Sequence, residues 1–425
     1  MCAGFVDCVA APSYGFVAAS GVVDVGQVDL AKETRVPHLF SPYTLKGVTL
    51  RNRIAMSPMT MYNSVDGRMD DYHVMYLGAR AAGGFGLVFP EQVAITADGR
   101  TTTSCAGIWD DSQIESHSRV TAMIKRMGGV PAIQLGHTGR KGSEIPPHIQ
   151  TNAQGTWKAL PPDHPDGWLC VAPSAIPYGG DHTFEVHALT LEEIKALHRS
   201  YADAARRAAE AGYQWVQLHF AHGYLASSFF SPLANHRTDE YGGSLRNRAR
   251  FLLDAMDAVR EVWPEDLPLT MRLGADDMHP DGIALDESIE AIGWMKEHGL
   301  DLADVSLGVN TDDMVGEAPW GIPGLFVERA ARVGREIGIP VSCSWNLGNP
   351  AVADSAIREG KIDIAMLGRP ALTNPHWPLY AARELGHEDP FSMLPADWGW
   401  WLRHLVGDED SIGLPPARRA GDSAH

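Results

Sequence analysis

Three side chains that can move protons follow one hydrophobic run near the middle of the chain. The run Trp215–His219 ends in His219, and His222 and Tyr224 follow it. Imidazole and phenol groups serve as general acids and hydrogen-bond donors, so a buried strand that ends in all three predicts acid–base chemistry. A lone histidine is more often structural than catalytic, and the prediction therefore depends on what else the fold brings to this place.

The run belongs to a regular alternation of apolar segments and helical patterns. The apolar segments are continuous, as expected for parallel strands covered on both faces, and they are Ile54–Met59, Gly86–Pro90, Val130–Leu135, Trp215–His219, Leu269–Leu273, Leu302–Ser306, Pro340–Ser344 and Ile364–Leu367. Helices are predicted between the later segments, at Leu191–Ala211, Arg246–Val262, Asp286–His298, Leu325–Ile337, Pro350–Glu359 and Pro378–Leu385. This order predicts an α/β fold, a (β/α)₈ TIM barrel in one domain. A doubly wound sheet is the alternative, but no G-x-G-x-x-G follows an early strand.

The predicted barrel spans residues 35–390. Residues 1–34 are expected to form a poorly ordered extension, with a cap packed on the barrel as the alternative, and 391–425 a C-terminal tail. The segment 141–187 is rich in Pro, Gly, Asp and His and follows the third strand. We expect it to be a lid or pocket wall over the catalytic face, or otherwise a surface excursion.

Composition limits the possible partners. The net charge of −18 argues against nucleic acid or an anionic membrane as a partner, and no apolar run is long enough to span a bilayer. Five scattered cysteines without a C-x-x-C pair argue against a structural zinc or iron–sulfur site and fit a reducing compartment. A cytoplasmic protein that binds no metal is therefore predicted.

Polar side chains follow most of the predicted strands, and in a barrel all strand ends meet at one mouth. They are Ser57–Tyr62, Glu91, Gln92, Gln134, His137, Arg140, Lys141, Arg272, Gly368 and Arg369. Each has a structural alternative: Arg272, for example, could pair with an internal carboxylate. A guanidinium after a glycine at the eighth strand suits a cofactor phosphate. Without a G-x-S-x-G nucleophile elbow, the mouth is better suited to holding a polar, planar or anionic molecule.

Four segments resemble the Old Yellow Enzyme family of FMN-dependent ene reductases, most closely its thermophilic-like bacterial class. They are Leu39–Tyr62, Ile133–Lys141, His219–Arg248 and Met366–Pro375. The resemblance implies FMN as cofactor, NADPH or NADH as reductant, and an activated alkene as the small-molecule substrate. It also implies a homo-oligomer, either a dimer or a tetramer.

The resemblance assigns a role to each matching residue. For the cofactor it implies Ser57, Pro58, Met59 and Thr60 beside the flavin, Gln134 on its pyrimidine part, Arg272 near N1 and C2=O, and Gly368 and Arg369 on the phosphate. For the substrate it implies that His219 and His222 hold the electron-withdrawing group, Tyr224 protonates the α-carbon and Tyr62 shapes the pocket. The flavin N5 would deliver hydride to the β-carbon.

The chain departs from the family pattern at several positions. Thr60 stands where the class usually has cysteine, and Gln92 where the family has a small residue beside the flavin. Phe220 replaces a small residue between the two histidines and is expected in the substrate pocket. The tail Asp397–Trp401 lacks the arginine of the class, so its tryptophans either cover a partner's pocket or are buried.

Other functions stay open from sequence alone. Gln92 and the long insertion suggest a specialised biosynthetic or catabolic flavoenzyme of the same family, either a tailoring reductase or a desaturase. A flavin-free barrel lyase or isomerase could use the two histidines and Tyr224 in acid–base work, and a non-catalytic barrel could serve as a binding protein.

Overall fold

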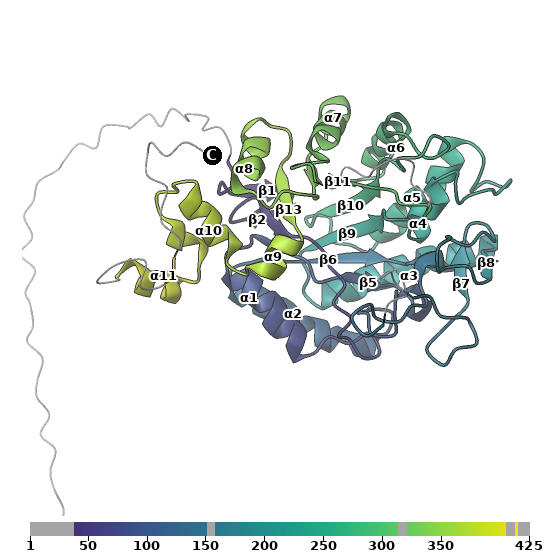
Figure 1. Ribbon diagram of the computed structural model, residues 1–425, viewed down its shortest axis with the longest axis horizontal. Coiled ribbons are helices and arrows are strands. Elements are labelled where there is room, and N and C mark those ends of the chain that lie inside the picture. Colours follow the sequence, from purple (N-terminus) through teal and green to yellow (C-terminus); the bar gives the residue numbers. More distant parts are fainter. Residues whose placement is uncertain (1–37, 151–157, 313–320, 405–412, 415–425) are drawn as a thin grey trace, which may run out of the picture. The chain divides into compact units, whose positions relative to one another are not determined.

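The computed structural model describes residues 38–150, 158–312, 321–404 and 413–414 (Figure 1). The strands are β1 (Tyr43–Leu45), β2 (Val48–Leu50), β3 (Ile54–Met56), β4 (Leu87–Val88), β5 (Gln92–Ala94), β6 (Val130–Gly136), β7 (Cys170–Ala172), β8 (Val186–Ala188), β9 (Trp215–Phe220), β10 (Leu269–Gly274), β11 (Leu302–Ser306), β12 (Val341–Cys343) and β13 (Ile364–Leu367). The helices are α1 (Asp71–Ala82), α2 (Ile114–Arg126), α3 (Leu191–Glu210), α4 (Leu225–Phe230), α5 (Leu245–Arg260), α6 (Leu285–Glu297), α7 (Val327–Ile337), α8 (Pro350–Arg358), α9 (Arg369–Thr373), α10 (Trp377–Glu384) and α11 (Ala396–Arg403). The predicted extension 1–34 lies outside the described residues.

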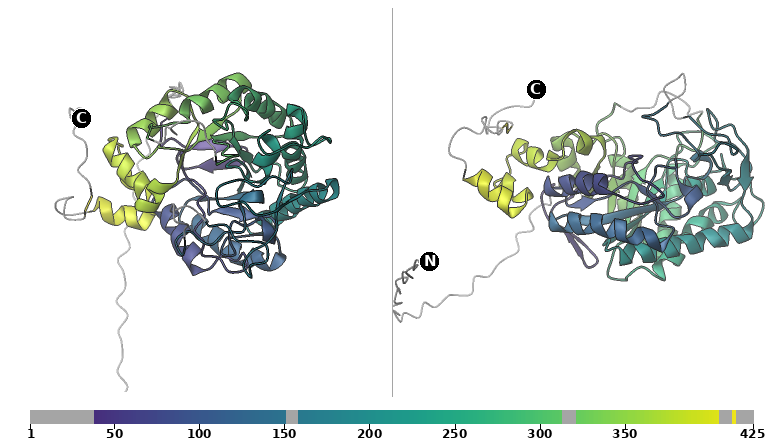
Figure 2. Two further views of the ribbon diagram at one scale, coloured as in Figure 1. Left: turned by 45° about the vertical axis from the view of Figure 1, so that its right-hand side comes forward. Right: turned by 90° about the horizontal axis from the view of Figure 1, so that it is seen from below.

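Parallel strands close into a barrel. The pairing runs from β3 through β4, β6, β9, β10, β11, β12 and β13 and returns to β3, while β5 adds a short second pairing to β6. Helices surround the strands in both views of Figure 2. The predicted (β/α)₈ barrel is confirmed, and each of the predicted strands and helices forms with ends that differ by at most three residues.

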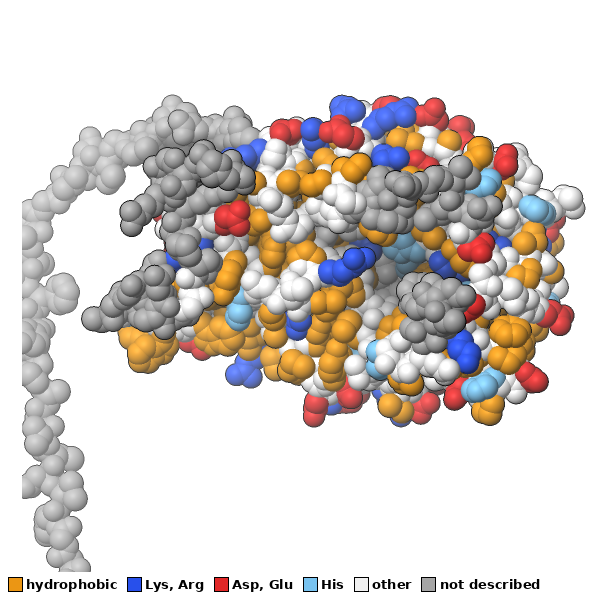
Figure 3. Space-filling model, in the orientation of Figure 1, with side chains coloured by type: hydrophobic (Ala, Val, Ile, Leu, Met, Phe, Trp, Pro, Cys, Tyr) orange, Lys and Arg blue, Asp and Glu red, His pale blue; other side chains and the backbone are white. Residues whose placement is uncertain are grey.

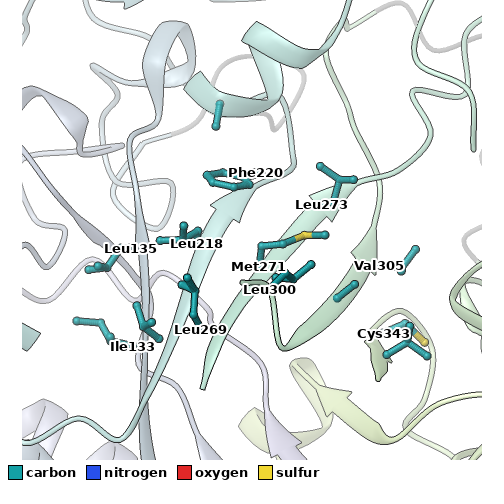
Figure 4. Close-up of a cluster of buried hydrophobic side chains, with 14 of the residues drawn as sticks. Ile133, Leu135, Leu218, Phe220, Leu269, Met271, Leu273, Leu300, Val305 and Cys343 are labelled. Atoms are coloured by element: carbon teal, nitrogen blue, oxygen red, sulfur yellow. The ribbon is translucent and has the colours of Figure 1, made fainter. Parts of the chain in front are cut away.

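Side chains of the barrel strands alternate between the interior and the surrounding helices. In β9, Val216 belongs to the core between strands and helices, as do Leu218 and Phe220 (Figure 4). Trp215 belongs to a separate cluster inside the barrel. Since His219 shares the face of Trp215, it points inward. Phe220 points the other way.

A hairpin closes the barrel at the end where the parallel strands begin, here called the lower end; the opposite end is the mouth, or upper end. The strands β1 and β2 pair in antiparallel register, and Tyr43, Val48 and Leu50 pack against interior side chains from the barrel strands. The cluster also contains Ala55, Leu87, Phe89, Ala132, Trp215, Leu302, Ile364 and Met366. Burying this apolar surface stabilises the closed floor.

Two helices, α1 and α2, occupy the first two connections and were not predicted from the sequence. Asp70 begins α1 with a capping box that it shares with His73. A comparable capping box, formed by Thr190 and Glu193, begins α3.

The insertion after β6 packs at the mouth of the barrel. Its strands β7 and β8 pair in parallel, and the Arg140 guanidinium donates to the carbonyls of Ile176 and Pro177. In the tail, α11 leaves Trp398, Trp400 and Trp401 exposed by 44%, 50% and 72%, so the alternative of a buried tail is wrong for these three side chains. Among the described helices, none combines the length and apolar character needed to cross a membrane.

Candidate active site

A polar network crosses the barrel interior one layer above the apolar floor. The Gln134 side chain donates to Gln217 over 2.7 Å, and Gln217 donates to Asp304 over 3.1 Å. Arg272 donates to the same Asp304 oxygen over 2.6 Å and to the Ser57 hydroxyl over 3.0 Å. The predicted alternative that Arg272 pairs with an internal carboxylate is therefore present. It does not exclude a cofactor role, because a guanidinium carries five N–H donors.

The two histidines lie in a hydrogen-bonded row above this network. His219 Nε2 is 3.3 Å from His222 Nδ1, and His222 Nε2 is 2.9 Å from the Ser306 hydroxyl. The Trp345 indole donates to the same hydroxyl over 3.1 Å. His222 has a positive φ of 61°, and Gly223 follows with φ of 70°. A Cβ at Gly223 would overlap the Val309 carbonyl, so the turn that aims His222 requires glycine there.

Both imidazoles are neutral at pH 7. Burial, followed by the positive charges of Arg272 and Lys141, lowers the pKa of His222 to about 3. Burial lowers the pKa of His219 well below its usual value, with His222 and Arg272 adding to the effect. A neutral imidazole carries one N–H donor and one lone pair, so each ring can donate only one hydrogen bond.

Tyr224 lies beside the histidines, with its ring centroid 4.9 Å from that of His219. Burial raises the pKa of Tyr224, and a hydrogen bond with Thr101 opposes the shift. Lys141 donates to the His222 carbonyl over 3.0 Å and lies 4.4 Å from the centre of the Tyr178 ring. Burial lowers the pKa of Lys141 to about 8. Because burial raises its pKa, the phenol of Tyr224 keeps its proton at neutral pH.

A cavity of about 800 Å³ adjoins the histidine row. Its wall comes from the strand ends of β3, β12 and β13, with Arg272 from β10 and His222 after β9. Figure 3 shows a hollow on this face with histidine side chains at its back. Arg369 is exposed at the cavity and makes no hydrogen bond or ion pair with the described residues. A cavity of this size that offers two guanidinium groups fits an anionic, cofactor-sized molecule.

The structure brings most of the predicted site residues to the mouth. Those that line the cavity are Ser57, Pro58, Met59, His222, Arg272, Gly368 and Arg369. Gln134 lies in the interior network. Burial raises the pKa of Tyr62, and the nearby Tyr224 raises it further, so the two tyrosines are neighbours. Thr60 is half-buried beside Met59.

Gln92 points into the interior. A Cβ at Gly136 would lie 3.0 Å from the Cβ of His219 and 3.1 Å from the Cγ of Gln92, so Gly136 separates the two side chains. The buried Gln92 Oε1 accepts no hydrogen bond from the described residues. Phe220, by contrast, is fully buried in the outer core and does not reach the site, which corrects its predicted place in the substrate pocket. Phe220 directly follows His219 in the strand, and successive side chains of a strand point to opposite faces.

Sequence reasoning missed Ser306 and Trp345. Ser306 ends β11, and Trp345 follows β12 with a positive φ of 71°. Ser306 ends a predicted strand and Trp345 follows one, so the strand-end pattern that indicated the other site residues applies to them as well. The positive φ of Trp345 could not be predicted from the sequence, because tryptophan rarely adopts this conformation.

A parallel barrel with neutral proton donors beside a cationic, cofactor-sized cavity is the architecture of a cofactor-dependent barrel enzyme. Residues 38–388 match the NADH:flavin oxidoreductase / NADH oxidase family, and the chain belongs to this family. Its Old Yellow Enzyme character and its use of FMN with NADH or NADPH follow from this membership and from the relatives. The flavin-free alternatives are thereby excluded.

Three relatives illustrate the similarity. The chain is 40% identical over 350 residues to an NADPH dehydrogenase of Geobacillus thermodenitrificans (strain NG80-2), covering 82% of this chain and 94% of that protein. An old yellow enzyme homologue from Zymomonas mobilis has a TM-score of 0.65 at 26% identity, covering 80% of this chain and 91% of that one. A 2-naphthoyl-CoA reductase in complex with 2-naphthoyl-CoA has a TM-score of 0.72 at 27% identity, covering 84% of this chain but only 53% of its own longer chain.

Proposed function

We propose that this protein is an ene reductase that adds hydrogen across an activated C=C bond, such as that of an α,β-unsaturated carbonyl compound. The observation that carries the proposal is the neutral pair His219 and His222 beside the protonated phenol of Tyr224. Neutral donors and a weak acid suit a reaction in which negative charge appears on an oxygen and a carbon then takes a proton.

The protein residues divide the work. The two imidazoles hold the substrate oxygen and stabilise the charge that develops there as the double bond is reduced. The Tyr224 hydroxyl then transfers its proton to the α-carbon. Tyr62 limits the space beside Tyr224, and the insertion residue His148, whose ring centroid lies 6.1 Å from that of Tyr62, adds to this wall.

The residues of the cavity fit FMN, which supplies hydride at N5 when bound. Arg272 would lie where negative charge accumulates on the reduced ring, and Arg369, which has no partner among the described residues, would hold the phosphate with Gly368. Gln134 and the free acceptor of Gln92 would face the polar edge of the ring. Pro58, Met59 and Thr60 would line its face.

The proposal is tested first by colour and turnover. The purified protein should be yellow, should bleach anaerobically with NADPH, and should regain its colour when an enone is added. If a reduced flavin persists with enones, nitroalkenes and cyclic imines alike, ene reduction is not its function. A specialised tailoring reductase or desaturase of the same family would instead reduce or form one narrow class of alkene.

Tyr224→Phe tests the proton donor. Bleaching by NADPH should be retained, while reoxidation by an enone should slow roughly 10²- to 10⁴-fold, the usual contribution of general acid catalysis. Tyr201→Phe is a matched control, since it removes a buried tyrosine hydroxyl on α3 that does not line the cavity and bonds to no described residue. Undiminished reoxidation in Tyr224→Phe would assign the proton to another group.

Arg369→Ala tests the phosphate site. The variant should lose FMN during gel filtration that the parent protein retains, because one charged donor is removed from the anion. Arg335→Ala, on the exposed face of α7, is the control for a lost surface charge. Equal retention of FMN by both variants would contradict the assignment.

We further propose a dimer or tetramer in which α11 forms part of the contact. Three exposed tryptophans on one short helix are unusual for an isolated surface and suit a protein interface. Light scattering should give a mass above 46.2 kDa, and replacing Trp400 and Trp401 with serine should lower it. A monomeric parent protein would overturn this part.

A further inference from the structure

The direction of the hydrogen bonds in the histidine row follows from one backbone amide. The Ala221 N–H donates to His219 Nδ1 over 3.3 Å, so this nitrogen carries no proton. The proton of neutral His219 must then lie on Nε2, which donates to His222 Nδ1. By the same reasoning, His222 holds its proton on Nε2 and donates it to the Ser306 hydroxyl.

This arrangement cannot hold a substrate oxygen with two donors. An oxygen that enters between the rings meets the N–H of His219 but the lone pair of His222 Nδ1. The single N–H of His222 is directed away, toward Ser306. Two donors become available only if His222 changes tautomer and carries its proton on Nδ1.

Ser306 has the properties needed to allow that change. A hydroxyl can accept or donate, and Ser306 is completely buried, so bulk water does not compete for it. The Trp345 indole can only donate, and it already occupies an acceptor position of Ser306 over 3.1 Å. The hydroxyl is thus left free to turn its own proton toward His222 Nε2.

We propose that Ser306, held by Trp345, is the positioning residue that switches the tautomer of His222 when a substrate oxygen binds. In the switched state Ser306 donates to His222 Nε2, and His222 Nδ1 and His219 Nε2 both donate to the oxygen. His222, which is partly exposed at the cavity, loses one proton at Nε2 and gains one at Nδ1 by exchange with cavity water, and Ser306 keeps its own, so the proton count is unchanged. This inference rests on the proposed function, in which the two histidines bind that oxygen.

This role for its indole N–H accounts for the strained position of Trp345. Its φ of 71° is costly for a bulky side chain, and its indole N–H reaches Ser306 from there. A second ring contact, with centroids 6.5 Å apart, relates Trp345 to His222 itself. Trp345→Phe keeps the ring and removes the N–H, so it separates the hydrogen bond from packing.

The test uses the FMN-loaded protein and 4-nitrophenol, whose phenolate oxygen imitates the oxyanion of the reaction. The dissociation constant is measured from the flavin absorbance, and the ¹⁵N resonances of His222 are followed in histidine-labelled protein and assigned with His222→Asn. In the parent protein, binding should move His222 Nδ1 from the unprotonated to the protonated range. Ser306→Ala should bind the probe about tenfold more weakly or worse, since a hydrogen bond to a group that supports a charge is lost, and its Nδ1 should not shift.

Two variants control for packing. Ser306→Thr retains a hydroxyl and should recover both the affinity and the ¹⁵N shift, and Trp345→Phe should fall between the parent and Ser306→Ala. Equal affinity and an equal shift in Ser306→Ala would overturn the proposal, as would failure of Ser306→Thr to recover either one. If the parent protein binds the phenolate and switches tautomer but reduces no alkene, the proposed function fails while the positioning role stands; no phenolate binding by the parent protein overturns both.

Discussion

The lower and upper halves of the barrel interior use the same strands for opposite purposes. In β9 the inward residues are Trp215, then Gln217, then His219, and in β11 they are Leu302, then Asp304, then Ser306. The first residue of each series belongs to the apolar floor, the second to the polar network, and the third to the histidine row. Within five residues of one strand, the interior therefore changes from apolar packing to the polar groups of the site.

The comparison teaches how stability and reactivity are kept apart. The floor gains its stability from apolar burial, which needs only shape and volume. The network buries a charged pair, Arg272 and Asp304, whose value depends on complete pairing. Changes in the floor should therefore affect unfolding alone, whereas changes above it should affect both unfolding and the cofactor.

Arg272→Met should have the largest effect. It leaves Asp304 buried without its cation, which should lower the free energy of unfolding by about 3–5 kcal/mol. It also removes a guanidinium from the cavity, so the variant should lose FMN. Denaturant unfolding and flavin retention measure the two losses. The double variant Arg272→Met/Asp304→Leu should recover stability without FMN; recovery of FMN as well would show that Arg272 is not needed by the cofactor.

Leu302→Ala should destabilise the floor alone. Leu302 is 2% exposed inside the barrel, and its truncation should cost about 2–5 kcal/mol in the free energy of unfolding. The folded fraction should keep its FMN and the rates of both half-reactions. A large change in either rate at a temperature where the variant is folded would contradict the separation of the two halves.

The dependence of stability on pH should distinguish the halves next. The pKa of His222 is about 3 in the folded chain and near 6.5 when unfolded, so the unfolded state binds more protons between these values and stability falls as the pH is lowered through that window. His222→Asn should reduce this slope by up to about 1.4 kcal/mol per pH unit. Leu302→Ala should shift the whole curve and keep its slope, and identical slopes in all three proteins would argue against a neutral buried His222.

Thr44→Ala should have the smallest effect. The hydroxyls of Thr44 and Thr49 meet on the exposed face of the floor hairpin, 2.9 Å apart, and their loss should change the free energy of unfolding by less than about 0.5 kcal/mol. Leu50→Ala, on the buried face of the same hairpin, should cost about 2–5 kcal/mol. Similar costs for both would mean that the hairpin does not work as an apolar plug.

Sequence patterns were sufficient to predict the barrel because its strands and helices have local signals in the sequence. Continuous apolar runs and capping residues such as Thr190 lie within a few positions of the elements that they define. The helices α1 and α2 were overlooked even though Asp70 supplies a comparable signal before α1. Phe220 was misplaced because its neighbours in sequence were considered before the alternation of the strand.

The polar network could be predicted only in part. Gln134 and Arg272 stood out as polar residues in apolar runs, but their partners depend on how the barrel closes. Arg272 joins Ser57 across 215 positions in the sequence and Asp304 across 32. Ser306 and Trp345 likewise come together from separate strands, and only the closed barrel makes them neighbours.

The hairpin β1–β2 also bears on kinetics. Because its side chains fill the lower opening, the described residues leave the upper opening as the route by which small molecules reach the interior. We expect reductant and oxidant to share this opening and to bind there in turn. Steady-state measurements should accordingly give parallel double-reciprocal lines, with each molecule becoming a competitive inhibitor of the other at high concentration.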